Sequence, residues 1–179
     1  MTVYEQLQAD LDAALREMRK QEAKAASLVA SLAAIFQKQA GFPTGAFSYR
    51  ANMDEAREQS SAAPADKIER SNEGTWKVTM DIRIDAASHQ TPIQLPAQVP
   101  GSHSFTFISL EVRFTEKQEI ELAIEDDASS RIQLSGITET DRQHLASFSN
   151  LIRKRIEDTI RWVATGEGNP TRRMGFHAT

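Results

Sequence analysis

The chain has 179 residues, of which 40% are hydrophobic and 26% charged, a balance typical of one globular domain rather than a disordered or membrane-embedded chain. Its formal net charge of −4 argues against a protein that coats nucleic acid through bulk electrostatic attraction. It contains no cysteine, which excludes disulfides, thiolate zinc sites and cysteine nucleophiles.

The beginning of the chain is charged rather than apolar. Glu5, Asp10 and Asp12 interrupt it, so it does not resemble a signal peptide. The strongest apolar run, residues 25–37, has thirteen uncharged residues and is too short to cross a bilayer. We therefore expect a cytoplasmic protein of bacterial type that does not bind membranes.

Residues 3–40 contain neither glycine nor proline and are predicted to form one long helix, within a first segment of residues 1–41. Thr2 and Glu5 have the spacing of a capping box, and Gly41 suits the left-handed position at a helix end. The apolar residues follow the alternating three- and four-residue spacing of a coiled-coil seam. This predicted oligomerisation seam comprises Tyr4, Leu7, Leu11, Ala14, Met18, Gln21, Ala25, Leu28, Leu32 and Ile35.

The two halves of this helix differ in their apolar width. Val29 and Phe36 widen the stripe in the second half, which predicts that this half docks in a core, whereas the first half offers only a narrow seam. At about 1.5 Å per residue the helix is roughly 57 Å long, which exceeds a compact body of about 35 Å. We expect the overhang to pair with a second copy. The alternative is an ordinary helix packed along its own domain.

Residues 42–73 are predicted to be a flexible linker, because large apolar side chains are sparse there. Residues 74–165 form the predicted body, and residues 166–179 a mobile tail. Alternating apolar residues predict strands over 76–85, 103–114, 120–124 and 131–135, which together make an antiparallel four-stranded meander.

Thr138 and Asp141 repeat the capping spacing and open a predicted helix that ends near Thr165. The predicted fold class is therefore α+β, with a long coiled-coil-like N-terminal helix and a four-stranded sheet packed against a C-terminal helix. The inner stripe of the C-terminal helix is predicted to be Leu145, Phe148, Ile152, Ile156, Ile160 and Val163.

Phe105 and Phe107 break the pattern of the second strand, because they point away from the face that carries Ile108 and Leu110. Either a bulge shifts the phase, or apolar material covers both faces of the sheet. A second apolar face would line a ligand pocket or receive the N-terminal helix. We favour the helix.

The sequence carries no catalytic or metal-binding pattern. Asp141, one helical turn before His144, is better explained as a first-turn carboxylate that faces the helix dipole than as a partner for the imidazole. The acidic turn at residues 125–127 lacks the glycine of a calcium loop. We expect no metal, no cofactor and no enzymatic activity. No two of the histidines have metal-ligand spacing, and they are His89, His103, His144 and His177.

Basic side chains are concentrated toward the C-terminal end of the chain and could bind phosphate groups. Cations near a helix C-terminus are also favoured by the helix dipole, and no aromatic platform interleaves with them. The candidate phosphate-binding residues are Arg153, Lys154, Arg155, Arg161, Arg172 and Arg173.

These observations predict a non-catalytic, self-associating binding or adaptor protein, whose long helix builds a homo-oligomer and whose body binds a protein partner. The alternative is a small-molecule carrier or sensor with an apolar pocket between sheet and helix. Binding of nucleic acid or of a phosphorylated ligand ranks third.

Overall fold

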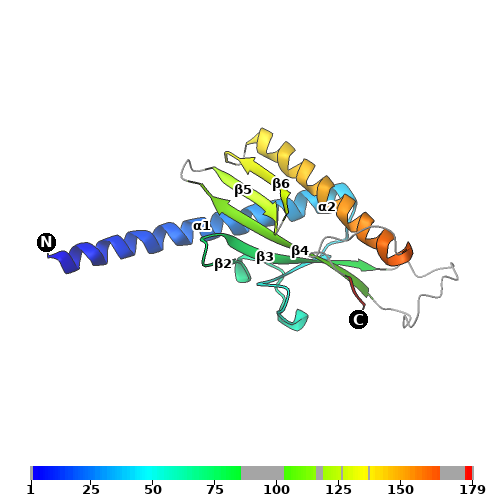
Figure 1. Ribbon diagram of the computed structural model, residues 1–179, viewed down its shortest axis with the longest axis horizontal. Coiled ribbons are helices and arrows are strands. Elements are labelled where there is room, and N and C mark those ends of the chain that lie inside the picture. Colours follow the sequence, from blue (N-terminus) through cyan, green and yellow to red (C-terminus); the bar gives the residue numbers. More distant parts are fainter. Residues whose placement is uncertain are drawn as a thin grey trace.

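The computed structural model describes residues 2–85, 103–115, 119–125, 127–136, 138–165 and 176–178. These residues form an α+β fold in which the long helix α1 (Val3–Ala40) leads into an antiparallel sheet, followed by the helix α2 (Glu139–Thr165) (Figure 1). The strands are β1 (Phe47–Arg50), β2 (Glu69–Arg70), β3 (Trp76–Asp85), β4 (His103–Phe114), β5 (Ile120–Ile124), β6 (Asp127–Leu134) and β7 (Phe176–Ala178).

Both ends of α1 carry the caps that the sequence predicts. The Thr2 hydroxyl accepts a hydrogen bond from the backbone N–H of Glu5 at 3.2 Å, and the Glu5 carboxylate accepts one from the backbone N–H of Thr2 at 2.6 Å. Gly41 ends the helix in the left-handed conformation, with φ of 71°, which costs glycine little because it has no Cβ. The helix therefore spans residues 3–40 without a break.

The sheet is larger than the four strands that we expected. Its main path runs β1-β3-β4-β5-β6, and the short strands β2 and β7 pair with β3 and β4 respectively. Residues 76–85, 103–114 and 120–124 form strands as predicted, and β6 is longer than the strand expected at 131–135. The additional strands lie in segments that are too short or too polar for an alternating pattern to predict them.

The segment 42–73, expected to be a flexible linker, instead supplies secondary structure to the body. β1 pairs with residues 79–82 of β3, and β2 pairs with residues 76–77 of the same strand. Two 3-10 helices lie between them, η1 (Arg57–Gln59) and η2 (Pro64–Asp66). Of the expected mobile tail, residues 176–178 form β7 against β4, and residues 166–175 and 179 lie outside the described residues.

The core lies on the sheet face that α2 and the second half of α1 cover (Figure 1). Met80, Ile108 and Leu110 of the sheet are each 0% exposed there, together with Leu32 of α1 and Ile152 of α2. Two helices on one face of an antiparallel sheet give each element a partner for its apolar side. On α2 the predicted stripe is buried at Leu145, Phe148, Ile152 and Ile156, whereas Ile160 is 44% exposed. The side chain of Val163 is not among those described.

Phe107 lies on the other face of the sheet, as its alternation with Ile108 requires. β3 and β4 stay in register over ten residue pairs, from Trp76 opposite Val112 to Asp85 opposite His103, so no bulge shifts the phase. The regular register excludes the first explanation, a bulge, and Phe107 is 7% exposed, so the second face is covered as well. The expectation that this second face receives α1 was wrong, because α1 packs with α2 on the face of Ile108.

Candidate functional site

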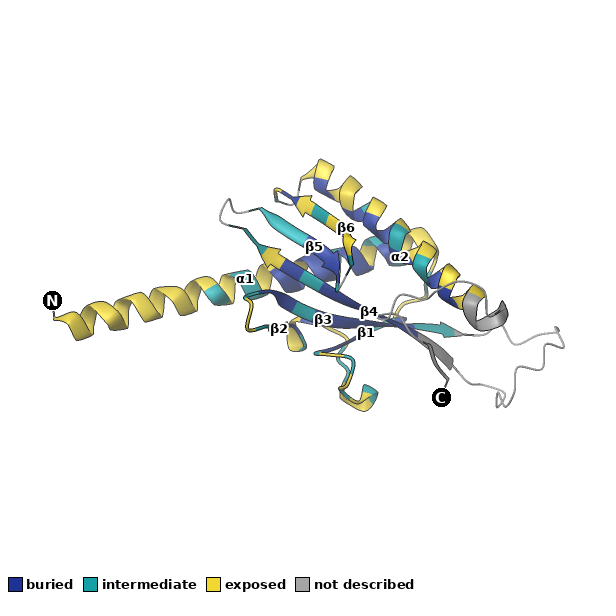
Figure 2. Ribbon diagram, in the orientation of Figure 1, coloured by how far each residue is buried: buried dark blue, intermediate teal, exposed yellow. Residues whose placement is uncertain are grey.

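The first half of α1 extends away from the body as an exposed helix (Figure 2). Every residue from Thr2 to Glu17 is exposed, including the large apolar side chains on one side of the helix. The exposed fractions are 79% for Val3, 72% for Tyr4, 63% for Leu7, 59% for Leu11 and 39% for Leu15. We call these five residues the exposed stripe. Single exposed apolar residues are common on protein surfaces, but a contiguous stripe marks an interaction site.

The second half of α1 is buried by the chain itself. Ala25, Leu28 and Leu32 of the predicted seam are buried at 0–6% exposure, and Ile35 packs partly buried against the same core. Met18 and Gln21 lie at the border and are half-buried. The seam predicted from the sequence thus divides into a part used for folding and a part left open.

The border between the two halves is marked by a contact with the sheet. Arg70 of β2 places its guanidinium Nη1 3.6 Å from the Sδ atom of Met18. Beyond this point toward the N-terminus, no residue between Thr2 and Glu17 is buried or half-buried. The exposed stripe therefore ends where the body begins.

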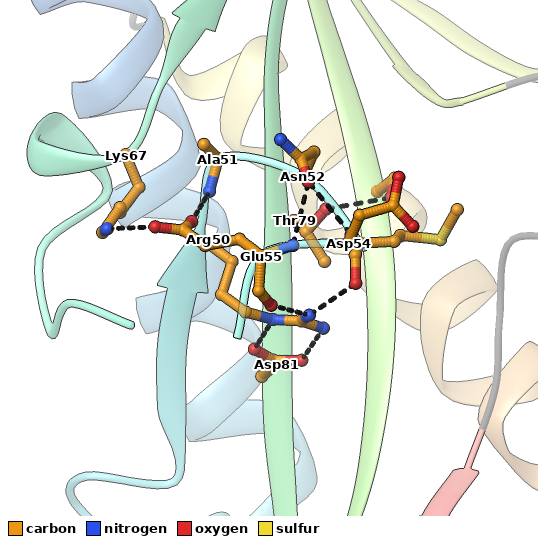
Figure 3. Close-up of polar contacts among 10 residues, drawn as sticks. Arg50, Ala51, Asn52, Asp54, Glu55, Lys67, Thr79 and Asp81 are labelled. Carbon is orange, nitrogen blue, oxygen red and sulfur yellow. Dashed lines mark hydrogen bonds and ion pairs between the residues drawn. The ribbon is translucent and has the colours of Figure 1, made fainter. Parts of the chain in front are cut away.

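A second candidate site lies on the sheet face opposite the helices. Arg50 donates two hydrogen bonds to Asp81, from Nε at 2.6 Å and from Nη2 at 2.8 Å, and the two side chains are 4% and 1% exposed (Figure 3). Nη1 of Arg50 donates to the backbone carbonyls of Met53 and Glu55, each at 2.8 Å. Buried charges are tolerated when they are paired and fully hydrogen-bonded in this way.

These contacts hold the loop of residues 51–55 against the sheet. Asn52 closes the loop on itself, because its side-chain oxygen accepts from the backbone N–H groups of Asp54 and Glu55 at 2.9 and 3.0 Å. The Glu55 carboxylate accepts from Lys67 at 2.5 Å and from the backbone N–H of Ala51 at 2.6 Å (Figure 3). The bond from Lys67, followed by that from Ala51, holds the pKa of Glu55 below its usual value.

A small, partly open cavity lies between the loop and the sheet. Lys77 donates to Glu125 at 2.8 Å and to Glu111 at 2.9 Å, and these bonds, with Glu125 contributing most, raise the pKa of Lys77. The cavity has a volume of about 110 Å³. This volume accommodates a few water molecules and falls below the roughly 300–1,000 Å³ of ordinary small-molecule pockets. Its walls are formed by Ala51, Asn52, Met53, Asp54, Lys77, Val78, Thr79, Ser109 and Glu125.

Sequence reasoning missed this polar cluster. Asp81 and Thr79 occupy the alternate positions of β3 that a half-buried strand normally turns to water, yet each is 1% exposed. Arg50 belongs to a segment that its composition marked as a linker. The one available signal was the pair of aromatic residues on β4, which indicated that this face is covered.

The expected partner face at Phe105 and Phe107 is only partly described. Phe107 is 7% exposed, so it contributes little surface to a partner. The side chain of Phe105 lies outside the described residues, although its backbone pairs with Arg83 of β3 and His177 of β7.

The basic residues of α2 do not converge on one spot, and three of them contact acids. Arg153 lies 3.7 Å from Glu157, and Arg161 lies 3.8 Å from Asp158. Arg155 points inward to Asp127 of β6, and burial lowers the pKa of its guanidinium. Lys154 is exposed, and Arg172 and Arg173 lie outside the described residues.

The Asp141 carboxylate caps α2. It accepts from the backbone N–H groups of Ser135 and Thr138, each at 3.0 Å, and from the Thr138 hydroxyl at 2.8 Å. Burial raises the pKa of Asp141, but these hydrogen bonds outweigh burial, so the net pKa is lowered. The predicted capping spacing of Thr138 and Asp141 is thereby confirmed, and Asp141 lies in the first turn of α2 as expected. His144 is exposed. The side chains of His103 and His177, and all of His89, lie outside the described residues.

Among the described residues, no group of three or more histidine and acidic side chains is placed to hold a metal ion. No helix in the described part of the chain has the length and apolarity that crossing a membrane requires. No family model, curated protein or solved structure matches the chain.

Proposed function

We propose that this protein is a non-catalytic, self-associating adaptor. The exposed stripe of α1 binds a second copy of the chain, and the sheet-helix body binds a different protein. The observation that carries the proposal is the exposure of Tyr4, Leu7 and Leu11, at 72%, 63% and 59%. These residues lie on the half of α1 that extends beyond the body.

The energetics of an isolated half-helix support this proposal. Fixing each backbone residue costs about 1–2 kcal/mol of conformational entropy, and isolated helices shorter than about 12–15 residues are marginal in water. Burying each large side chain of the stripe returns about 1.5–3 kcal/mol. Five such side chains per chain, counted in both copies, offset an association cost of about 4–15 kcal/mol. Pairing two overhangs therefore stabilises segments that are marginal alone.

The body offers its partner surface at the loop of residues 51–55 and the neighbouring strands. The buried bidentate pair of Arg50 and Asp81 fixes this loop, so the surface is preorganised rather than disordered. A fixed polar surface that surrounds a cavity of only about 110 Å³ suits a protein partner better than a metabolite.

The carrier alternative has a weaker basis. The space between the sheet and the helices contains side chains such as Leu32, Ile108 and Ile152, each 0% exposed, and the cavity lies on the other face. A thermal-shift screen with apolar metabolites tests this alternative. A ligand-dependent rise in melting temperature that core-filling substitutions abolish would favour a carrier. Binding of phosphate through α2 is the weakest of the three, because Arg153, Arg155 and Arg161 already contact acids.

Self-association is tested by light scattering on the full-length chain and two matched variants. Leu7→Glu with Leu11→Glu places two carboxylates on the stripe, and Ala9→Glu with Ala13→Glu places the same two charges on the opposite, equally exposed side of the helix. We expect the wild type and the Ala9/Ala13 variant to be oligomers and the Leu7/Leu11 variant to be a monomer. A wild type that is monomeric at all accessible concentrations refutes the proposal.

A further inference from the structure

We infer that the second copy binds the exposed stripe in the antiparallel orientation, with Leu7 of each copy opposite Leu11 of the other. This inference rests on the proposed self-association and adds the orientation, the register and the spacing of the two bodies.

The orientation follows from the direction in which the two halves of α1 present their apolar sides. An α-helix has 3.6 residues per turn, so residues 18 apart project in the same direction after five turns. Leu7 therefore projects in the same direction as Ala25, and Met18 in the same direction as Phe36. Ala25 and Phe36 are buried at 0% and 1% exposure by the chain's own sheet and α2. The body thus lies on the same side of α1 as the exposed stripe. It is displaced along the helix axis from the exposed half (Figure 2).

A parallel second copy does not fit this arrangement. Its α1, lying along the stripe and running in the same direction, would continue past Met18 into the space that the sheet and α2 of the first copy occupy. An antiparallel copy avoids this collision, because its helix begins, rather than continues, at that end. Its N-terminus points at the body of the first copy and stops beside the contact of Arg70 with Met18.

The register follows from the length of the stripe and the sizes of its side chains. Pairing Leu7 with Leu11 of the other copy places Tyr4 opposite Ala14, so a large side chain meets a small one, as interdigitated packing requires. This register aligns residues 3–15 of both copies, the whole exposed length up to the body. Shifting the pairing by one heptad would bring Tyr4 against the half-buried Gln21 and press the tip of one helix into the other body.

The antiparallel arrangement places the two bodies at opposite ends of the paired helical segments, residues 3–15 of each copy. Met18 of one copy and Met18 of the other are then separated by about 18 residues along the axis, or roughly 27 Å at about 1.5 Å per residue. The two loops of residues 51–55 lie on separate bodies, so the dimer would bridge two partner molecules. The class of assembly inferred here is a two-ended bridge rather than a side-by-side dimer.

The absence of native cysteine makes a disulfide test clean, because every thiol present is one that was introduced. The variants are Tyr4→Cys, Ala14→Cys, and the chain that carries both substitutions. Positions 4 and 14 of one helix are about 15 Å apart, beyond the roughly 7 Å limit for a disulfide, so no bond forms within one chain. Each full-length variant is oxidised and analysed on a non-reducing gel, with light scattering of the wild type in parallel.

In the antiparallel register only the double variant forms a covalent dimer, because position 4 faces position 14 of the other copy. A covalent dimer of Tyr4→Cys alone overturns the orientation and leaves self-association intact. A wild-type dimer by light scattering with no covalent dimer in any variant overturns the register. A monomeric wild type refutes the proposed function and this inference with it.

Discussion

Leu11 and Val29 lie 18 residues apart on α1 and project from the same side of the helix, yet Leu11 is 59% exposed and Val29 is 0% exposed. One continuous apolar stripe therefore meets two environments, a core built by the same chain and open solvent. Leu11 and Val29 differ in exposure because the sheet and α2 cover only the second half of α1. This contrast motivates the self-association proposed here.

The same substitution in the two halves of α1 should have different effects on stability. Leu32→Ala removes a fully buried side chain and is expected to lower the free energy of unfolding by about 2–5 kcal/mol, because it leaves a cavity. Leu11→Ala is expected to leave the stability of the single chain within about 0.5 kcal/mol, at concentrations where the chain is monomeric. Urea unfolding followed by circular dichroism measures both. Equal losses would mean that the overhang is docked on the body.

Breaking the buried ion pair should be costly. Asp81→Asn leaves the Arg50 guanidinium buried without its counter-charge, and we expect a loss of about 3–5 kcal/mol in the free energy of unfolding. The control is Glu17→Gln, which removes the exposed partner of Lys20 and should cost less than about 1 kcal/mol. Chemical denaturation measures the free energy of unfolding of both variants. A loss below about 1 kcal/mol in Asp81→Asn would show that the buried ion pair does not stabilise the fold as proposed.

Tyr49 should make the protein sensitive to alkali. Burial raises the pKa of its phenol from 10.0 to about 12, so between these values the folded chain keeps a proton that the unfolded chain releases. Stability from this group is present below pH 10 and falls by up to about 1.4 kcal/mol per pH unit as the pH rises toward 12.

The matched variant for this titration is Tyr49→Phe, which keeps the ring and removes the ionisable group. Unfolding of both chains is measured at about pH 8 and about pH 11. The wild type is expected to lose more stability between the two conditions than the variant does. Identical losses would show that the phenol is not protected from ionisation by burial.

The cap on α2 should depend on the ionised form of Asp141. Asp141→Ala removes the acceptor for the N–H groups of Ser135 and Thr138, and the expected loss of stability is about 1–3 kcal/mol. Because the folded pKa of Asp141 lies below its usual value, the contribution of this carboxylate is present above the unfolded pKa and is lost as the pH falls through the folded pKa. The difference between wild type and variant should therefore shrink in acid. A pH-independent difference would contradict the assignment.

Salt should strengthen self-association rather than weaken it. The charged side chains between residues 3 and 15 at neutral pH are Glu5, Asp10 and Asp12, so the pairing of two α1 overhangs brings like charges together. Screening should lower the dissociation constant about threefold or more between about 0.05 and about 0.5 M salt, as the Debye length shortens. Sedimentation at several salt concentrations measures this effect. Dissociation by salt would indicate an assembly held by ion pairs.

The parts of the fold that the sequence predicts are those with local signals. The bounds of α1 follow from Thr2, Glu5 and Gly41, which act within a few residues of the helix ends. The strands β3, β4 and β5 follow from alternation along each strand. Three residues of the exposed stripe, Tyr4, Leu7 and Leu11, also follow from the seven-residue periodicity, whereas Val3 and Leu15 lie outside the predicted seam.

The parts that the sequence does not predict depend on distant partners. β1 has four residues and includes Arg50, whose burial makes sense only with Asp81, 31 residues further along the chain. The segment around it is polar and small, which composition alone assigns to a linker. Packing between elements likewise decides which face of the sheet the helices cover, and therefore the position of α1 beside α2. The periodic pattern of one helix or one strand alone does not determine it.

The molar mass of the intact wild-type chain, measured by light scattering over a range of concentrations, tests the central claim most directly. We expect a mass that rises with concentration toward twice the 19.9 kDa of one chain. A mass that stays at 19.9 kDa throughout would show that the exposed stripe does not bind a second copy, and would contradict the account.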